Sequence, residues 1–174
     1  MNDFEIVDSS FSTIINAPIG EIDIPTWCFN LPEQEYQTCS PAYVSAGFTT
    51  APDAERMSIN VEIIDGTLMA QHYVERFAQK DHLLLGSTSD IFTPTGRTTI
   101  QAIGELRVRE LGAGTCEFTN RMRSRATEEF RTFLGRQGIP FEQFRAPRQP
   151  ASIAHNQAET PLFAASIERA ARAN

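Results

Sequence analysis

The middle of the chain is a series of segments that alternate between apolar and polar residues and are separated by turn signals. Candidate strands cover residues 43–49, 56–64, 67–77, 82–92, 98–111 and 115–124. Hairpin signals are Asp65-Gly66 and Gly112-Ala113-Gly114, and a further turn is indicated by Thr93-Pro94-Thr95-Gly96. The pattern predicts consecutive antiparallel strands, one face of which must be covered by another layer.

The last two candidate strands indicate which side chains share a face. One face carries Ile100, Ala102, Gly104, Leu106 and Val108, with Cys116, Phe118, Asn120 and Met122 on the next strand. The opposite face carries Gln101, Glu105, Arg107 and Arg109, with Glu117, Thr119, Arg121 and Arg123. The arginines resemble a nucleic-acid-binding stripe, but the cross-strand glutamates favour a solvated sheet face.

Helical patterns flank these strands. Before them we expect a strand at residues 11–16 and two short helices at 19–29 and 32–38; after them, a helix capped by Thr127 and ended by Gly138 and Pro140, then a long helix over about 151–173. This order predicts an α+β helix-grip fold, in which a curved antiparallel sheet wraps around the long C-terminal helix and leaves an internal cavity. We expect residues 1–174 to form a single ligand-binding or catalytic domain.

Composition restricts the class of partner. The chain has 22 acidic and 15 basic residues and a formal net charge of -7, which argues against nucleic acid or an anionic membrane as the main ligand. No segment approaches the roughly 20 apolar residues that span a bilayer, and the N-terminus does not resemble a signal peptide. The three cysteines match no zinc or redox spacing. We therefore expect a cytoplasmic protein that has buried free thiols and binds a small molecule.

The long helix contains a polar pair, His155 and Glu159, on the stripe that should face the sheet. The stripe reads His155, Glu159, Leu162, Phe163, Ser166, Ile167 and Ala170. Histidine and glutamate four residues apart project side by side and can reach one divalent ion. The alternative is an ordinary hydrogen bond near a helix start capped by Ser152. Pro161 predicts a kink or break just after the pair.

Three segments together resemble the 2,4-diacetylphloroglucinol hydrolase family, a part of the Bet v 1-like (START-type, polyketide cyclase-like) superfamily. They are the helix His155-Asn-Gln-Ala-Glu159, the strand His72-Tyr73-Val74-Glu75 and the segment Cys39-Ser40-Pro41-Ala42-Tyr43. The resemblance implies a metal site of Glu75, His155 and Glu159, and hydrolysis of a carbon–carbon bond between an acyl group and a phenolic ring. Tyr43 stands where that family has a further histidine ligand, so the metal would be held by three protein ligands and water, or His72 would be recruited as a ligand, or the metal is lost and the cavity kept. Zinc is the first choice of metal, iron and manganese are alternatives, and a cavity without metal stays open.

The resemblance also suggests Tyr43, His72 and Tyr73 as the residues that hold a phenol oxygen or relay a proton. A two-residue turn at Asp65-Gly66 pairs Ile59 with His72 and leaves Glu75 facing outward from the apolar side of strand 56–64, unless a bulge reverses it. The second hypothesis is a metal-free polyketide cyclase-like or hydrophobic-ligand-binding protein of the same fold. Either way the expected partner is a small aromatic or polyketide-like ligand, and a homodimer is left open.

Overall fold

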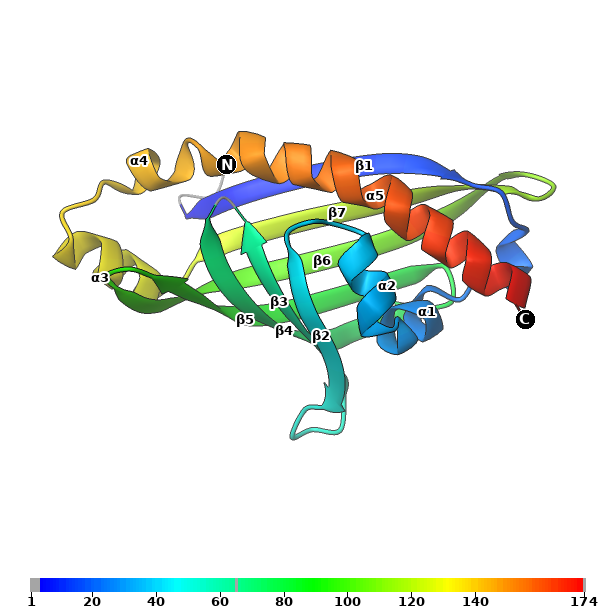
Figure 1. The fold of residues 1–174 in the computed structure, drawn as a ribbon, viewed down its shortest axis with the longest axis horizontal. Helices are drawn as coiled ribbons and strands as arrows, with labels where there is room; N and C mark the ends of the chain where they lie inside the picture. The colour runs from blue at the N-terminus through cyan, green and yellow to red at the C-terminus, as the bar shows by residue number, and fades with distance from the viewer. Residues whose placement is uncertain (1–3, 65, 174) are drawn as a thin grey trace.

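The computed structural model describes residues 4–64 and 66–173. One antiparallel sheet contains seven strands in the order β1-β7-β6-β5-β4-β3-β2, as Figure 1 shows. The strands are β1 (Glu5–Ile15), β2 (Tyr43–Thr50), β3 (Arg56–Ile64), β4 (Thr67–Gln79), β5 (His82–Thr93), β6 (Gly96–Gly112) and β7 (Thr115–Ala126). All six strands predicted between residues 43 and 124 are therefore confirmed. The first strand is confirmed too, although it begins six residues earlier than predicted.

The helices also follow the predicted order, with corrections at their ends. They are the short 3-10 helix Ile19–Glu21, α1 (Ile24–Asn30), α2 (Glu33–Thr38), α3 (Glu128–Arg136), α4 (Phe141–Arg145) and α5 (Arg148–Ala173). The single helix predicted over 19–29 is in fact split, because Asp23 caps α1 by accepting a hydrogen bond from the Thr26 amide. The prediction had no counterpart of α4.

The predicted break at Pro161 is wrong, because α5 continues through this residue as one helix. Proline removes the amide that would bond to the carbonyl of Gln157. Both Pro161 and Gln157 are exposed, so water can satisfy that carbonyl. The helix therefore keeps His155 and Glu159 on one continuous face.

The molecule has two main layers, because α5 crosses one face of the curved sheet (Figure 1). The short helices α1 and α2 lie beside the C-terminal half of α5, and α3 and α4 lie at the opposite end of the molecule. This is the helix-grip arrangement that the sequence predicts. Two groups of buried side chains hold the layers together. The larger includes Ile15, Ile24, Leu83, Phe118 and Ile167, and the smaller includes Ile6, Ile91, Ile100, Phe130 and Leu134.

The face assignment is right for β6 and β7 and wrong for β3. Leu106, Val108 and Phe118 are buried, and the outer arginines form ion pairs such as Arg109–Glu117 at 3.0 Å. The predicted pairing of Ile59 with His72 is confirmed, although Asp65 of the turn lies outside the described residues. However, the inner face of β3 carries Ser58, Asn60 and Glu62 together with Ile64, while Met57, Ile59, Val61 and Ile63 point outward and Ile63 is 48% exposed.

Thr127 caps α3 and ties it to the sheet. Its hydroxyl oxygen accepts a hydrogen bond from the Phe130 amide at 3.0 Å and donates one to the carbonyl of Thr99 at 2.7 Å. We expect Thr127→Ala to lower the free energy of unfolding by about 1 kcal/mol, the usual effect of losing an N-cap. Urea denaturation measures this, with Thr50→Ala at the exposed end of β2 as the control. Equal losses in the two variants would contradict a capping role.

None of the helices in the described part of the chain combines the length and the apolar character needed to cross a membrane. All three cysteines are free thiols, with Cys39 and Cys116 buried and Cys28 partly buried, which agrees with the prediction.

Candidate functional site

A cavity of about 200 Å³ lies between the concave face of the sheet and α5. Its walls are mainly apolar and draw on both groups of buried side chains, with Trp27, Leu85 and Leu106 from the larger and Ile91 and Ile100 from the smaller. The expected internal cavity is therefore present. Its volume leaves room for a small molecule.

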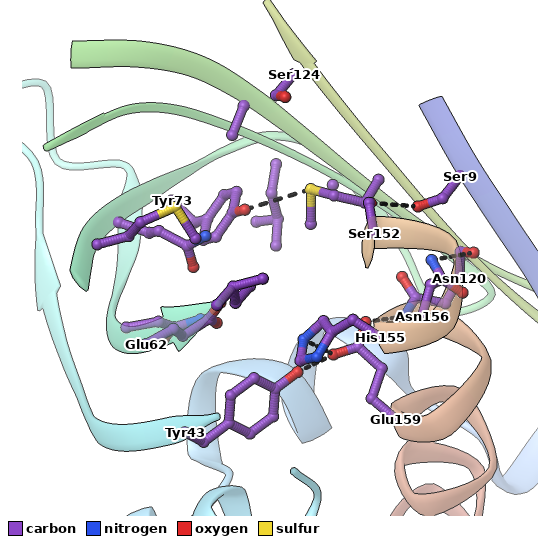
Figure 2. A pocket seen from close by; sticks show the side chains of 18 of the residues that line it. Ser9, Tyr43, Glu62, Tyr73, Asn120, Ser124, Ser152, His155, Asn156 and Glu159 are labelled. Carbon is purple, nitrogen blue, oxygen red and sulfur yellow. Dashed lines mark hydrogen bonds and ion pairs between the residues drawn. The ribbon is translucent and has the colours of Figure 1, made fainter. Parts of the chain in front are cut away.

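Polar side chains from three elements, β2, β7 and α5, meet on one side of this cavity. Glu159 of α5 accepts hydrogen bonds from the Tyr43 hydroxyl, from His155 Nε2 at 3.0 Å and from Asn120 Nδ2 at 2.9 Å. Figure 2 shows this arrangement, with Tyr43 and His155 both directed at the Glu159 carboxylate. Glu159 is only 5% exposed, so its charge is stabilised by these three donors rather than by water.

A second buried carboxyl, that of Glu62 on β3, lies across the cavity from His155 (Figure 2). Its Oε1 accepts a hydrogen bond from the Tyr36 hydroxyl at 2.7 Å. The ring of Tyr36 stacks on that of Tyr43, with the centroids 4.1 Å apart. The two tyrosines therefore lie in contact, and each donates its hydroxyl hydrogen to a different buried carboxyl group.

Burial shifts the pKa values of these groups strongly. It raises the pKa of the Glu62 carboxyl to about 7, and the nearby charge of Glu159 adds to this effect. Burial alone would lower the pKa of His155, but its hydrogen bond and ion pair with Glu159 prevail, and the net shift is upward. The pKa values of Tyr43 and Tyr73 lie well above their usual range, mainly through burial, so both phenols stay protonated.

Four of the six residues predicted for the site line the cavity: Tyr43, Tyr73, His155 and Glu159. The Tyr73 hydroxyl donates to the sulfur of Met122 at 3.4 Å. His72 lies on the other face of the sheet, where its Nδ1 is 3.4 Å from the carbonyl oxygen of Thr88. The structure thus does not bring His72 to the cavity.

Glu75 also lies away from the cavity, and the expectation that it faces outward needs correction. It shares the inner face with Tyr73 but forms an ion pair with Arg56 at 2.6 Å. The guanidinium of Arg56 in turn lies 4.5 Å from the ring centre of Phe29 in α1. Glu75 therefore holds the sheet to α1 and does not join His155 and Glu159.

The residues as placed do not fit a metal ion. Glu75 is paired elsewhere, and both oxygens of Glu159 already accept hydrogen bonds from protein donors. Over residues 4–64 and 66–173, histidine, cysteine, aspartate and glutamate side chains form no group of three or more that could hold a metal. The expected zinc, iron or manganese site of Glu75, His155 and Glu159 thus has no support in the geometry.

Glu62 and Tyr36 are site residues that the sequence analysis missed. Glu62 alternates with Ser58 and Asn60, and this polar side of β3 was interpreted as the solvent side. A usable signal was present, since the register places Ser58 opposite Tyr73 and Glu62 opposite Met69. Large apolar side chains opposite a polar strand face indicate an enclosed surface rather than a solvated one.

Neither a protein-family model nor a curated protein sequence matches this chain. Solved structures match it along nearly its whole length. The Zhui aromatase/cyclase from Streptomyces sp. R1128 superposes with a TM-score of 0.65 at 12% sequence identity, over 93% of each chain. The START superfamily protein from Mycobacterium smegmatis gives 0.54 at 11% identity, over 96% of this chain and 99% of that one.

A further match is the di-domain ARO/CYC StfQ from the steffimycin biosynthetic pathway, with a TM-score of 0.60 at 14% identity. It covers 98% of this chain and 53% of StfQ. Identities this low show the fold alone, so the chain has the Bet v 1-like, START-type fold that the sequence predicts. These matches give no support to the narrower resemblance to 2,4-diacetylphloroglucinol hydrolases.

Proposed function

We propose that this protein binds a small aromatic or polyketide-like ketone in its cavity and transfers protons on it with its own side chains. The observation that carries the proposal is the position of Glu62 and the His155–Glu159 pair on facing sides of one mainly apolar cavity. Two titratable groups set apart in this way are the usual components of general acid–base catalysis. The aromatase/cyclases among the structural matches support the same ligand class.

The roles follow from the hydrogen bonds. Because Nε2 of His155 donates to Glu159, the neutral ring carries its hydrogen there and leaves Nδ1 as the basic nitrogen. Nδ1 removes a proton from the carbon next to the ligand carbonyl. Glu62, protonated in a large fraction of molecules near pH 7, donates its hydrogen to the carbonyl oxygen and neutralises the enolate as it forms. The reverse transfers return both protons.

Enolisation of this kind is the elementary step of aldol cyclisation and of the dehydration that makes a ring aromatic. Both reactions need proton transfer and a shaped apolar cavity. Carbon–carbon hydrolysis by a metal-bound water, the first hypothesis from the sequence, needs a donor set that the described residues do not form. We therefore favour the cyclase-like alternative.

The test uses β-tetralone, a bicyclic ketone of suitable size, and follows exchange of its α-hydrogens in deuterated buffer by proton NMR. We expect the protein to accelerate exchange over buffer, and Glu62→Gln and His155→Gln each to slow the protein-dependent rate at least tenfold. Glu110→Gln, an exposed carboxyl on β6, is the control. Tight binding of β-tetralone with no acceleration would reject catalysis and leave a ligand-binding protein.

A further inference from the structure

Gln71 on β4 lines the cavity, and its side chain carries an unused hydrogen-bond acceptor. It is 6% exposed, and its Oε1 is fully buried and has no partner. Over residues 4–64 and 66–173, two other buried side-chain atoms lack a partner, Thr98 Oγ1 and Arg123 Nε, but neither residue lines the cavity. Gln71 therefore differs from them in belonging to the wall of a space that a ligand can fill, and rotation of its amide group about the last side-chain bond would present Oε1 to that ligand.

No donor among the described residues satisfies this oxygen, and several nearby hydroxyl groups are bonded to other atoms. The Tyr73 hydroxyl donates to Met122, the Ser58 hydroxyl donates to Asn60 Oδ1 at 2.8 Å, and Ser87 is bonded to Ser89 and to the His72 amide. Native proteins rarely leave a buried carbonyl oxygen without a donor, since its desolvation is then uncompensated. An amide retained in such a position points to a partner that arrives with the ligand.

We propose that Gln71 Oε1 accepts a hydrogen bond from a hydroxyl group of the ligand, so that the cavity selects phenols or enols over ligands without a hydroxyl hydrogen. This inference rests on the proposed function and narrows its ligand class. Gln71 on β4 pairs with Asn60 on β3, and the next pair on the same inward face consists of Met69 and Glu62. The ligand hydroxyl at Gln71 and the ligand oxygen at Glu62 are therefore bound by the same wall of the cavity.

The experiment compares two probes of nearly the same shape, β-naphthol and β-methoxynaphthalene, of which only the first can donate a hydrogen bond. Titration calorimetry measures the affinity of each for the wild-type protein and for Gln71→Met, which keeps the length of the side chain and removes the amide. We expect the wild type to bind β-naphthol about tenfold more tightly than β-methoxynaphthalene, the ratio that one buried hydrogen bond of about 1.4 kcal/mol provides. Gln71→Met should bring the two affinities within about twofold.

Thr98→Val is the matched control, because it also removes a buried oxygen without a partner, but away from the cavity. It should keep the wild-type preference. Gln71→Leu replaces Gln71→Met if the latter does not fold. A preference for β-naphthol that persists in the Gln71 variants overturns the inference and leaves the proposed function standing. A wild-type protein that binds neither probe overturns both.

Discussion

Replacing Glu159 with alanine is expected to lower the free energy of unfolding by about 3–5 kcal/mol, because it leaves several buried donors without an acceptor. The hydroxyl of Tyr43, Nε2 of His155 and Nδ2 of Asn120 all donate to this carboxylate. Their hydrogens come from β2, α5 and β7, so the loss loosens the contact between the helix and two strands. Urea denaturation at pH 7 measures the change.

Two further variants make this result specific. Glu159→Gln keeps one acceptor oxygen and should lose clearly less stability than Glu159→Ala. Glu142→Ala removes a helix carboxylate whose ion pair with Arg145 is exposed to solvent, and should cost less than about 0.5 kcal/mol. If Glu159→Ala costs no more than Glu142→Ala, the polar cluster does not contribute to holding α5 on the sheet.

The second large effect concerns pH. Burial raises the pKa of Glu62 from its ordinary value of 4.5 to about 7 in the folded protein. The folded state therefore binds the proton more tightly than the unfolded state, and stability is fully present below pH 4.5 and falls as the pH rises through 7. At about 1.4 kcal/mol for each tenfold difference in proton affinity, the loss by pH 9 is about 3 kcal/mol.

His155 acts in the same direction. The pKa of His155 in the folded protein is raised above its ordinary value of 6.5. Its contribution to the free energy of unfolding is therefore fully present below pH 6.5 and is lost as the pH rises through the pKa of the folded state. The wild-type protein should thus lose stability between pH 5 and pH 9. Glu62→Gln, whose neutral amide can still accept the hydrogen bond from Tyr36, should remove most of the pH-dependent loss of stability that is due to Glu62.

Denaturation curves at pH 5, 7 and 9 for wild type and Glu62→Gln measure the difference. The variant should be more stable than wild type by about 2–3 kcal/mol at pH 9 and similar to it at pH 5. Glu110→Gln, at an exposed position, should run parallel to wild type. Parallel curves for wild type and Glu62→Gln would show that Glu62 ionises as easily in the folded protein as in the unfolded chain.

The strands and their faces show how much of the fold is predictable from the sequence. Local turn chemistry and period-two alternation were enough for six strands, for the pairing of Ile59 with His72, and for the buried faces of β6 and β7. They failed at β3 because alternation identifies two faces but not which one is enclosed. A polar wall of a mainly apolar cavity reverses the usual rule at β3, so Ser58 and Glu62 point inward while Ile63 is left exposed.

The functional site, too, was predictable only in part. The proximity of His155 and Glu159 could be predicted from the sequence, because a four-residue spacing on a helix fixes it. Contacts between distant segments could not be predicted. The hydrogen bond from Tyr43 to Glu159 joins residues 116 positions apart, and the hydrogen bond from Tyr36 to Glu62 depends on the docking of α2. Of the residues that the family resemblance suggested, Tyr43 and Tyr73 line the cavity, whereas Glu75 lies away from it and is bound by Arg56.

The polar inner face of β3 has a consequence for folding. All seven strands precede α5 in the chain, so the sheet can pair before the helix docks. Without α5, Ser58, Asn60 and Glu62 of β3 would be open to water, where a carboxyl group ionises readily. Closing the cavity removes water from Glu62, and the folded protein therefore takes up a proton there between the ordinary pKa of 4.5 and the raised pKa of about 7.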